Sequence, residues 1–248
     1  EPASGGTGGF AVIADTPWQA IQARAAVKVD WEAGPAAGFS SADFERRLLA
    51  ALDDEKAGFV FHSRGDVFGA LAGAPRTVTA DYRVPYLAHA AMEPVNCTVQ
   101  VKDGRATVWA STQVPGIARS AVARVLGLPA DQIDVHVELL GGGFGRRLDV
   151  DFVAQAARVA AQADGAPVQV LWTRDQDTTH DLYRPACAAR FKAGLDAEGN
   201  LLAWYDLSAG QAIVPQVLRR VFGLPAAGPD KTAAEGAFDQ PYEWPAAR

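Results

Sequence analysis

The 248-residue sequence predicts an α+β fold in which mixed sheets pack against helices. Asp103-Gly104 is a strong hairpin signal between runs of alternating apolar and polar residues, and the segment 196–200 connects a second predicted hairpin. Helical patterns with a 3.6-residue period lie between these strands, so strands and helices are interleaved along the chain. Hydrophobic residues make up 49% of the sequence, which is enough to bury a sizeable core.

The first 36 residues predict a strand–helix–strand unit. Phe10–Ala14 is a short apolar run typical of a buried strand, and Val27–Trp31 alternates as a half-buried strand does. Between them, Asp15-Thr16 followed by Pro17 is a helix-start signal for a helix to about Ala26. A second helix is expected from about residue 41 to 52. The Gly/Ala-rich stretch after it indicates that residues 37–76 link this unit to a main body at 77–248.

The main body is expected to open with a strand at 77–84 and a hairpin of 97–101 with 106–111. A helix should follow Gln113 and end at Gly127, which is placed for a left-handed C-cap. Two further strands are expected at 133–140 and 168–172, with a helix at 151–163 between them. A second hairpin is expected from 188–193 with 201–207. Residues 223–248 lack periodicity and are expected to form loops.

Composition excludes several classes of function. The net charge is −6 and no basic run contains interleaved aromatic residues, so nucleic acid is not an expected partner. Cys97 and Cys187 belong to no Cys-x-x-Cys pair, which argues against a zinc site or a cysteine-held iron–sulfur cluster and favours two ordinary buried thiols. The four histidines are too scattered to predict a protein-ligated metal.

Targeting signals are also missing from the sequence. It contains no apolar run of the length that spans a membrane and no signal peptide. It starts at Glu1 without Met, which suggests a processed or excised chain. The compartment therefore stays open between periplasm and cytoplasm.

A Gly-rich turn, Gly141–Gly145, lies between the strand at 133–140 and the helix at 151–163. Consecutive glycines allow positive φ and let a ligand approach the main chain, and such a turn before a helix suits an anion. Arg146 and Arg147 would add charge-assisted donors. The turn is neither a Walker loop nor a Gly-x-Gly-x-x-Gly fingerprint. The alternative is a tight turn with solvated arginines.

Two further features have local interpretations. Gln113 could cap the following helix or hydrogen-bond a cofactor, and the residues alone favour the cap. His180 and Asp181 could form an imidazole–carboxylate pair, but no nucleophile lies nearby. No Gly-x-Ser-x-Gly elbow is present, which argues against an ordinary hydrolase.

Four segments in order resemble the molybdopterin-binding domain of the xanthine dehydrogenase/aldehyde oxidase family. They are YLAHAAMEPVNC at 86–97, WASTQ at 109–113, GGGFGRRL at 141–148 and WTRDQDTTHDLYRP at 172–185. The Arg-Arg-Leu and His-Asp-x-Tyr-Arg-Pro strings, with EGAFD at 235–239, are most similar to isoquinoline 1-oxidoreductase beta subunits. Residues 1–36 resemble the C-terminal part of the family's α/β hammerhead domain, and 77–248 a truncated first molybdopterin-binding domain.

The resemblance implies a large subunit that binds molybdopterin, as the cytosine dinucleotide, and hydroxylates N-heteroaromatics or aldehydes with oxygen from water. Electrons would pass to an iron–sulfur small subunit or domain and on to an electron acceptor. The implied cofactor-binding residues are Gln113, Gly142, Gly143, Phe144, Gly145 and Arg146. Gln113 would lie near the oxo group of the molybdenum. The sulfurs of the pterin would hold the metal, so no protein ligands to it are needed. Relatives of this subgroup often carry a twin-arginine export signal.

Two departures limit what the resemblance implies. Leu148 stands where xanthine-type members carry an acidic residue, so purine recognition through this position is not available. The family's catalytic glutamate belongs to a Gly-rich motif of a second cofactor-binding domain, and this chain has no such motif. No catalytic residue is therefore expected here, and the chain alone is expected to be inactive. Whether it holds cofactor by itself stays open.

Two other classes of function remain as alternatives. One is a non-catalytic binding or assembly module with the same fold. The other is an unrelated nucleotide- or phosphate-binding enzyme that uses the glycine turn, which the ordered motifs make the weaker alternative.

Overall fold

The computed structural model describes residues 9–34, 36–55, 58–225 and 228–248. Contacts divide the chain into two compact units. Unit 1 comprises residues 1–32, 88–183 and 217–225, and unit 2 comprises 33–87, 184–216 and 226–248. Each predicted domain, at 1–36, 37–76 and 77–248, includes residues outside the described ranges, and these boundaries stay predictions.

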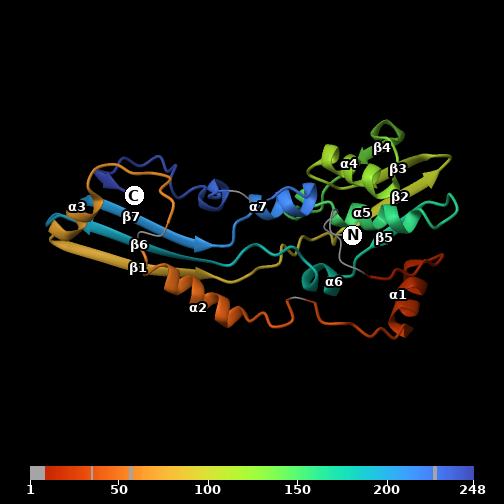
Figure 1. The fold of residues 1–248 in the computed structure, drawn as a ribbon, viewed down its shortest axis with the longest axis horizontal. Coiled ribbons are helices and arrows are strands. Elements are labelled where there is room, and N and C mark those ends of the chain that lie inside the picture. Colours follow the sequence, from red (N-terminus) through yellow and green to blue (C-terminus); the bar gives the residue numbers. More distant parts are fainter. Residues whose placement is uncertain (1–8, 35, 56–57, 226–227) are drawn as a thin grey trace. The chain divides into compact units, whose positions relative to one another are not determined.

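Unit 1 is built on a four-stranded sheet with the order β4-β3-β2-β5 (Figure 1). The predicted hairpin is confirmed as β2 (Asn96–Lys102) and β3 (Arg105–Ala110), which pair antiparallel. β4 (Ile133–Val137) runs parallel to β3, and β5 (Val168–Leu171) antiparallel to β2. A parallel pair needs a crossover, and α4 (Pro115–Leu126) provides it between β3 and β4.

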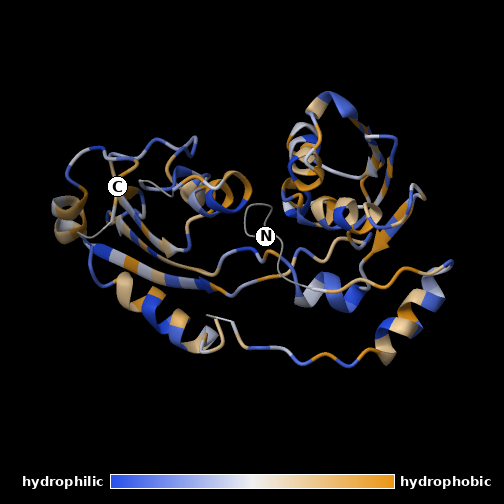
Figure 2. Ribbon diagram, turned by 45° about the vertical axis from the view of Figure 1, so that its right-hand side comes forward, coloured by the Kyte–Doolittle hydropathy of each residue, from blue (hydrophilic) through white to orange (hydrophobic). Residues whose placement is uncertain are grey.

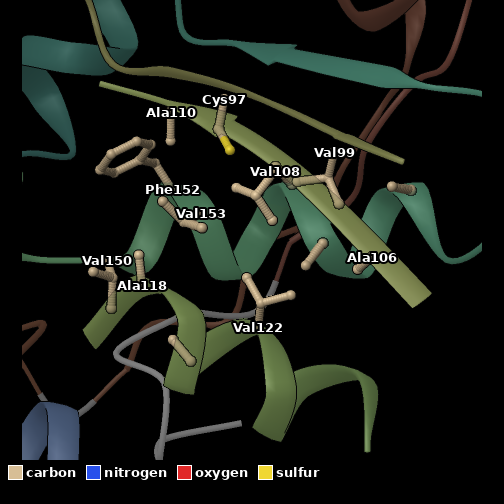
Figure 3. Packing of buried hydrophobic residues seen from close by; sticks show 14 of the residues in the cluster. Cys97, Val99, Ala106, Val108, Ala110, Ala118, Val122, Val150, Phe152 and Val153 are labelled. Carbon is tan, nitrogen blue, oxygen red and sulfur yellow. The ribbon is translucent and has the colours of Figure 1, made fainter. Parts of the chain in front are cut away.

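The core of unit 1 lies between this sheet and two helices. The inward residues of β2 and β3 alternate with more exposed ones, as expected of a sheet with one covered face. Figure 3 shows side chains of the strands meeting those of α4 and of α5 (Asp151–Ala160). The largest buried apolar side chains of this core are Val95, Val99, Val108, Val122, Ile133, Phe152 and Val153.

Helix α4 ends where the sequence predicts. Gly127 has φ 67° and closes the helix with a hydrogen bond from its N–H to the Ala123 carbonyl. A Cβ is unfavourable in this left-handed conformation, so Gly127→Ala is expected to lower the free energy of unfolding by about 1 kcal/mol. Urea unfolding measures this. The control is Gly116→Ala in the same helix, where a Cβ would meet nothing within 4 Å; equal losses in both variants would contradict the cap.

Unit 2 is built on a second four-stranded sheet with the order β1-β6-β7-β8 (Figure 1). Three long strands pair antiparallel, and the short β8 pairs parallel with β7. Their bounds are β1 Arg76–Val84, β6 Cys187–Leu195, β7 Leu201–Gly210 and β8 Ala246–Ala247. The predicted second hairpin is confirmed as β6 and β7.

Two helices pack on the unit 2 sheet. α2 (Ser41–Ala51) buries Leu48 against Ala186 and Ala188, and α3 (Val67–Gly73) buries Val67 near Tyr205. Figure 2 shows hydrophilic and hydrophobic residues mixed along α2, as one buried face requires. The predicted linker therefore contains one predicted helix and one that the sequence did not reveal.

Asp206 of β7 is a half-buried carboxylate whose Oδ1 has no hydrogen-bond partner among the described residues. Burial raises the pKa of Asp206 to about 6. This is above the unfolded value of about 4, so the folded state binds more protons between these pH values and stability falls as pH rises through the window. Asp206→Asn is expected to be more stable than the wild type by about 1–3 kcal/mol at pH 8. Unfolding at pH 4 should show no gain; a gain independent of pH would contradict the assignment.

The predicted strands at 10–14 and 27–31 are wrong. The helix between them is confirmed as α1 (Pro17–Ala26), with a capping box formed by Thr16 and Gln19. Neither flanking segment is a strand, and both are mostly exposed. An apolar run needs a neighbouring strand to pair with, and the described residues provide none here.

The other elements differ from prediction mainly in length. The strand at 133–140 ends at Val137, and α6 (Arg174–Thr179) was not predicted. The C-terminal stretch expected to be loop contains β8. The remaining short helical segments are Ala130–Gln132, Arg146–Leu148, Val214–Val217, Leu218–Phe222 and Lys231–Ala234. None of the helices in the described part of the chain is both long and apolar enough to cross a lipid bilayer.

Candidate functional site

The glycine turn of unit 1 has an unusual backbone. Gly142 and Gly145 have φ values of 103° and 99°, and Phe144 between them has φ 54°. A bulky residue in the left-handed region is strained, and such strain gathers at functional sites. The Phe144 side chain is not held by packing, because the residue is 77% exposed. The turn therefore presents an aromatic ring to its surroundings at an energetic cost.

The turn also presents unused backbone donors. The N–H groups of Gly142, Gly143, Phe144 and Gly145 donate to no acceptor among the described residues. The N–H of Gly141 differs, because it donates to Glu93 Oε2 at 3.0 Å. Free N–H groups on consecutive residues of a glycine turn can bind an anion or an oxygen-rich ligand.

Gln113 lies against this turn. A Cβ built on Gly143 would be 2.6 Å from Gln113 Oε1, so the absence of a side chain at Gly143 leaves room for the amide. The predicted capping role of Gln113 is wrong: the N-cap of α4 is Val114, and no side chain caps the helix. The exposed amide is instead free to bind a ligand beside the turn.

Arg147 fixes the turn from inside the protein. Its side chain is fully buried, and Nη2 donates to Glu93 Oε2 at 2.7 Å while Nε donates to the Gly142 carbonyl at 2.9 Å. Nη1 binds Ser111 through both its carbonyl, at 3.1 Å, and its hydroxyl. One guanidinium thus joins three of the four segments in which the sequence resembles a known family.

Glu93 is the matching acceptor. Burial alone would raise its pKa, but hydrogen bonds from Asn96 and from the Gly141 N–H, together with the Arg147 charge, hold the pKa of Glu93 below its ordinary value. The ionised carboxylate accepts from both the turn and Arg147. Its backbone N–H also donates to the Gly141 carbonyl at 3.0 Å.

Arg146 is buried as well, with 2% of its side chain exposed. Its two Nη atoms donate to both carboxylate oxygens of Asp151 at 2.8 and 2.9 Å, and its Nε lies 2.8 Å from Asp181 Oδ1. Burial would lower the pKa of Arg146, but these carboxylates raise it above its ordinary value. The sequence suggested that Arg146 and Arg147 donate to an anion or lie in solvent, whereas both bind protein acceptors.

Asp181 pairs with a histidine distant in sequence. His89 donates to Asp181 Oδ2 from its backbone N–H at 2.6 Å, and its Nδ1 lies 2.9 Å from the same oxygen. The predicted His180–Asp181 pair is wrong, because the ring of His180 contacts the Thr179 hydroxyl at 3.0 Å.

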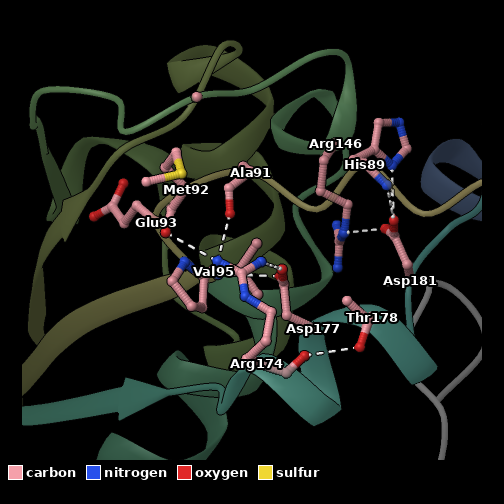
Figure 4. Close-up of polar contacts among 12 residues, drawn as sticks. His89, Ala91, Met92, Glu93, Val95, Arg146, Arg174, Asp177, Thr178 and Asp181 are labelled. Carbon is pink, nitrogen blue, oxygen red and sulfur yellow. Dashed lines mark hydrogen bonds and ion pairs between the residues drawn. The ribbon is translucent and has the colours of Figure 1, made fainter.

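Helix α6 ties the segment after His89 to the rest of unit 1 (Figure 4). Arg174 donates to the carbonyls of Ala91 and Met92 at 2.7 and 2.9 Å and pairs with Asp177 at 2.9 Å. Asp177 in turn accepts from the Val95 N–H at 3.3 Å. The segments 86–97 and 172–185 are therefore bound to each other, and both support the turn.

Several of these supporting residues were missed at the sequence level. Ser111, Asp177 and His89 carry no local pattern that reveals a partner 36 to 92 positions away. Asp151 binds Arg146 only five positions away, but its residue type alone does not indicate a buried ion pair. α6 had a usable signal, since Thr173 and Gln176 have the Ser/Thr-x-x-Gln spacing of a capping box and form one. The Met-Glu-Pro string around Glu93 points to a role only through its resemblance to the family.

The chain matches the family model described as the molybdopterin cofactor-binding domain over residues 52–209. It is 31% identical over 193 residues to the aldehyde oxidoreductase molybdenum-binding subunit PaoC of Escherichia coli (strain K12), covering 77% of this chain and 26% of the relative. It is 33% identical over 135 residues to the isoquinoline 1-oxidoreductase subunit beta of Brevundimonas diminuta, covering 54% and 17%.

Solved structures agree in fold. Quinoline 2-oxidoreductase of Pseudomonas putida 86 superposes with a TM-score of 0.56 at 22% identity, over 79% of this chain and 25% of that one. The chain spans about a quarter or less of the length of these relatives. The matched region contains the glycine turn, Gln113 and both buried arginines. The chain belongs to the molybdopterin cofactor-binding domain family of the xanthine dehydrogenases and aldehyde oxidases.

Proposed function

We propose that this chain forms part of the molybdopterin cradle in the large subunit of a molybdenum hydroxylase that acts on aldehydes or N-heteroaromatics. The observation that carries the proposal is the glycine turn, whose four consecutive free N–H groups lie beside the Gln113 amide. The buried guanidinium groups of Arg146 and Arg147 hold the turn in place through bonds to protein groups. The donors are thus preorganised before any ligand arrives.

The residues present fit an oxygen-rich cofactor. A side chain on Gly143 would occupy the space of the Gln113 amide, so this glycine keeps the cradle open. We assign Gln113 and residues 142–145 to direct cofactor contact. Arg146 is assigned to holding the turn, because its guanidinium is engaged by two aspartates. When bound, the molybdenum cofactor, proposed in its cytosine dinucleotide form, accepts two electrons from the substrate.

The residues of this chain bind and orient rather than transfer protons in this proposal. The Gln113 amide and the turn N–H groups fix the position of the cofactor, and exposed Phe144 forms an apolar wall beside it. The names of the relatives, which include an aldehyde oxidoreductase and an isoquinoline 1-oxidoreductase subunit, support the substrate class. An iron–sulfur subunit or domain would receive the electrons, and the catalytic base would come from outside this chain.

The test is to produce the chain in a host that makes molybdopterin cofactors and to measure molybdenum and pterin in the purified protein. We expect cofactor to copurify and to be lost from the Gln113→Ala variant. Oxidation of aldehydes or isoquinoline by this chain alone is expected to be undetectable. Turnover by the isolated chain would contradict the external base, and loading unaffected by changes in the turn would contradict the cradle.

A further inference from the structure

One carboxylate oxygen of Asp181 contacts both the backbone and the ring of His89. Asp181 Oδ2 accepts from the backbone N–H of His89 and contacts its Nδ1, at 2.6 and 2.9 Å. The other oxygen of Asp181 lies 2.8 Å from Arg146 Nε and accepts from the Leu182 backbone N–H at 2.7 Å, which holds the carboxylate in place. The side chains of His89 and Asp181 are 14% and 1% exposed. His89 is thus a partly buried residue whose ring is held against Asp181 (Figure 4).

The second ring nitrogen of His89 lies beside the glycine turn. A Cβ built on Gly145 would be 3.7 Å from His89 Nε2, and no other heavy atom outside its chain neighbours would be within 4 Å of it. No described residue hydrogen-bonds to Nε2. The open space at Gly145 is therefore bordered by a ring nitrogen without a protein partner.

The Asp181 carboxylate fixes the role of the other ring nitrogen, Nδ1. Burial alone would raise the pKa of Asp181, but the hydrogen bonds from His89 lower it, so the carboxylate is ionised and Nδ1 carries a hydrogen. The ring keeps its Nδ1–H on Asp181, so a hydrogen carried on Nε2 would face the turn as a charge-assisted donor to a bound oxyanion.

We propose that His89 is a further ligand-binding residue of the cradle, whose Nε2 joins the free N–H groups of the turn in binding an oxyanion. This rests on the proposed function and deepens it. The oxyanion could come from the phosphate of the cofactor or from oxygen around its metal. Inorganic phosphate and molybdate, which are tetrahedral oxyanions of similar size, serve as separate probes for the two sources.

Two substitutions separate the two ring nitrogens. His89→Asn keeps an amide nitrogen near the position of Nδ1 and so retains the bond to Asp181, but it has nothing at Nε2. His89→Gln places an amide nitrogen near the position of Nε2. Isothermal titration of the cofactor-free chain with phosphate and with molybdate should show binding at least about 10-fold weaker in His89→Asn and within about 3-fold of wild type in His89→Gln. Urea midpoints show that both variants fold.

Each result decides the inference. Phosphate binding alone assigns the oxyanion to the cofactor's phosphate, and molybdate binding alone to oxygen around the metal. Equal affinities of His89→Asn and wild type overturn the proposal, as does a wild-type chain that binds neither probe. The proposed function is judged independently, by the pterin content of the wild-type chain. If equal amounts of cofactor copurify with the wild type and with His89→Asn, the proposed cradle stands but His89 is not part of it.

Discussion

Arg146→Met is expected to lower the free energy of unfolding by about 3–5 kcal/mol, because it removes the only guanidinium bound by two buried carboxylates in the described part of the chain. Asp151 and Asp181 would keep their burial and lose their compensating charge. The pair of hydrogen bonds to Asp151 is bidentate, the geometry in which Arg contributes most. Urea unfolding at pH 7 measures the loss.

Acidification provides an internal check on the cause. If the loss comes from uncompensated carboxylates, protonating them should relieve it, so Arg146→Met and wild type should become closer in stability as pH falls toward 4. The matched control is Arg105→Met, which breaks an exposed pair whose partners, Arg105 and Asp134, are 49% and 55% exposed. Its expected cost is at most about 1 kcal/mol. Comparable losses in the two variants would show that burial of Arg146 is not decisive.

The hairpins and the crossover helix could be predicted because their signals are local. Asp103-Gly104 sets the β2–β3 turn, and Gly127 ends α4, each within a few residues of the structure it determines. The strands at 10–14 and 27–31 failed for the opposite reason. A strand depends on a partner that its own residues do not encode, and no described neighbour pairs with either segment.

The candidate site divides in the same way. The glycine turn and Gln113 were found from short motifs, and the structure brings them together. The fate of the two arginines could not be read locally, because each also binds a carboxylate far along the chain. Arg147 reaches Glu93 across 54 positions, and Arg146 reaches Asp181 across 35. The residue type indicates that the two arginines donate charge-assisted hydrogen bonds. Only the fold decides whether the acceptor is a ligand or a group of the protein.

Gly143→Ala is expected to reduce the cofactor content of the purified chain at least about 10-fold while changing the free energy of unfolding by less than about 1 kcal/mol. Gly143 does not have a left-handed φ, so alanine meets no backbone strain. Its Cβ would lie 2.6 Å from Gln113 Oε1, the end of an exposed and flexible side chain. Gln113 would therefore turn away at little cost to folding and leave the cradle.

Gly141, two positions earlier in the turn, serves as the control, because a side chain there is expected to affect stability rather than the Gln113 amide. A Cβ on Gly141 would lie 2.3 Å from the Cβ of Glu93, an atom next to the backbone that cannot rotate aside, so Gly141→Ala should lose stability first. A double variant tests whether Gly143→Ala acts through the Gln113 amide. If the alanine at position 143 acts only by displacing Gln113, the Gln113→Ala variant and the Gly143→Ala/Gln113→Ala double variant should retain the same amount of cofactor. Wild-type cofactor content in Gly143→Ala would contradict contact between the cofactor and the Gln113 amide, and with it the proposed cradle.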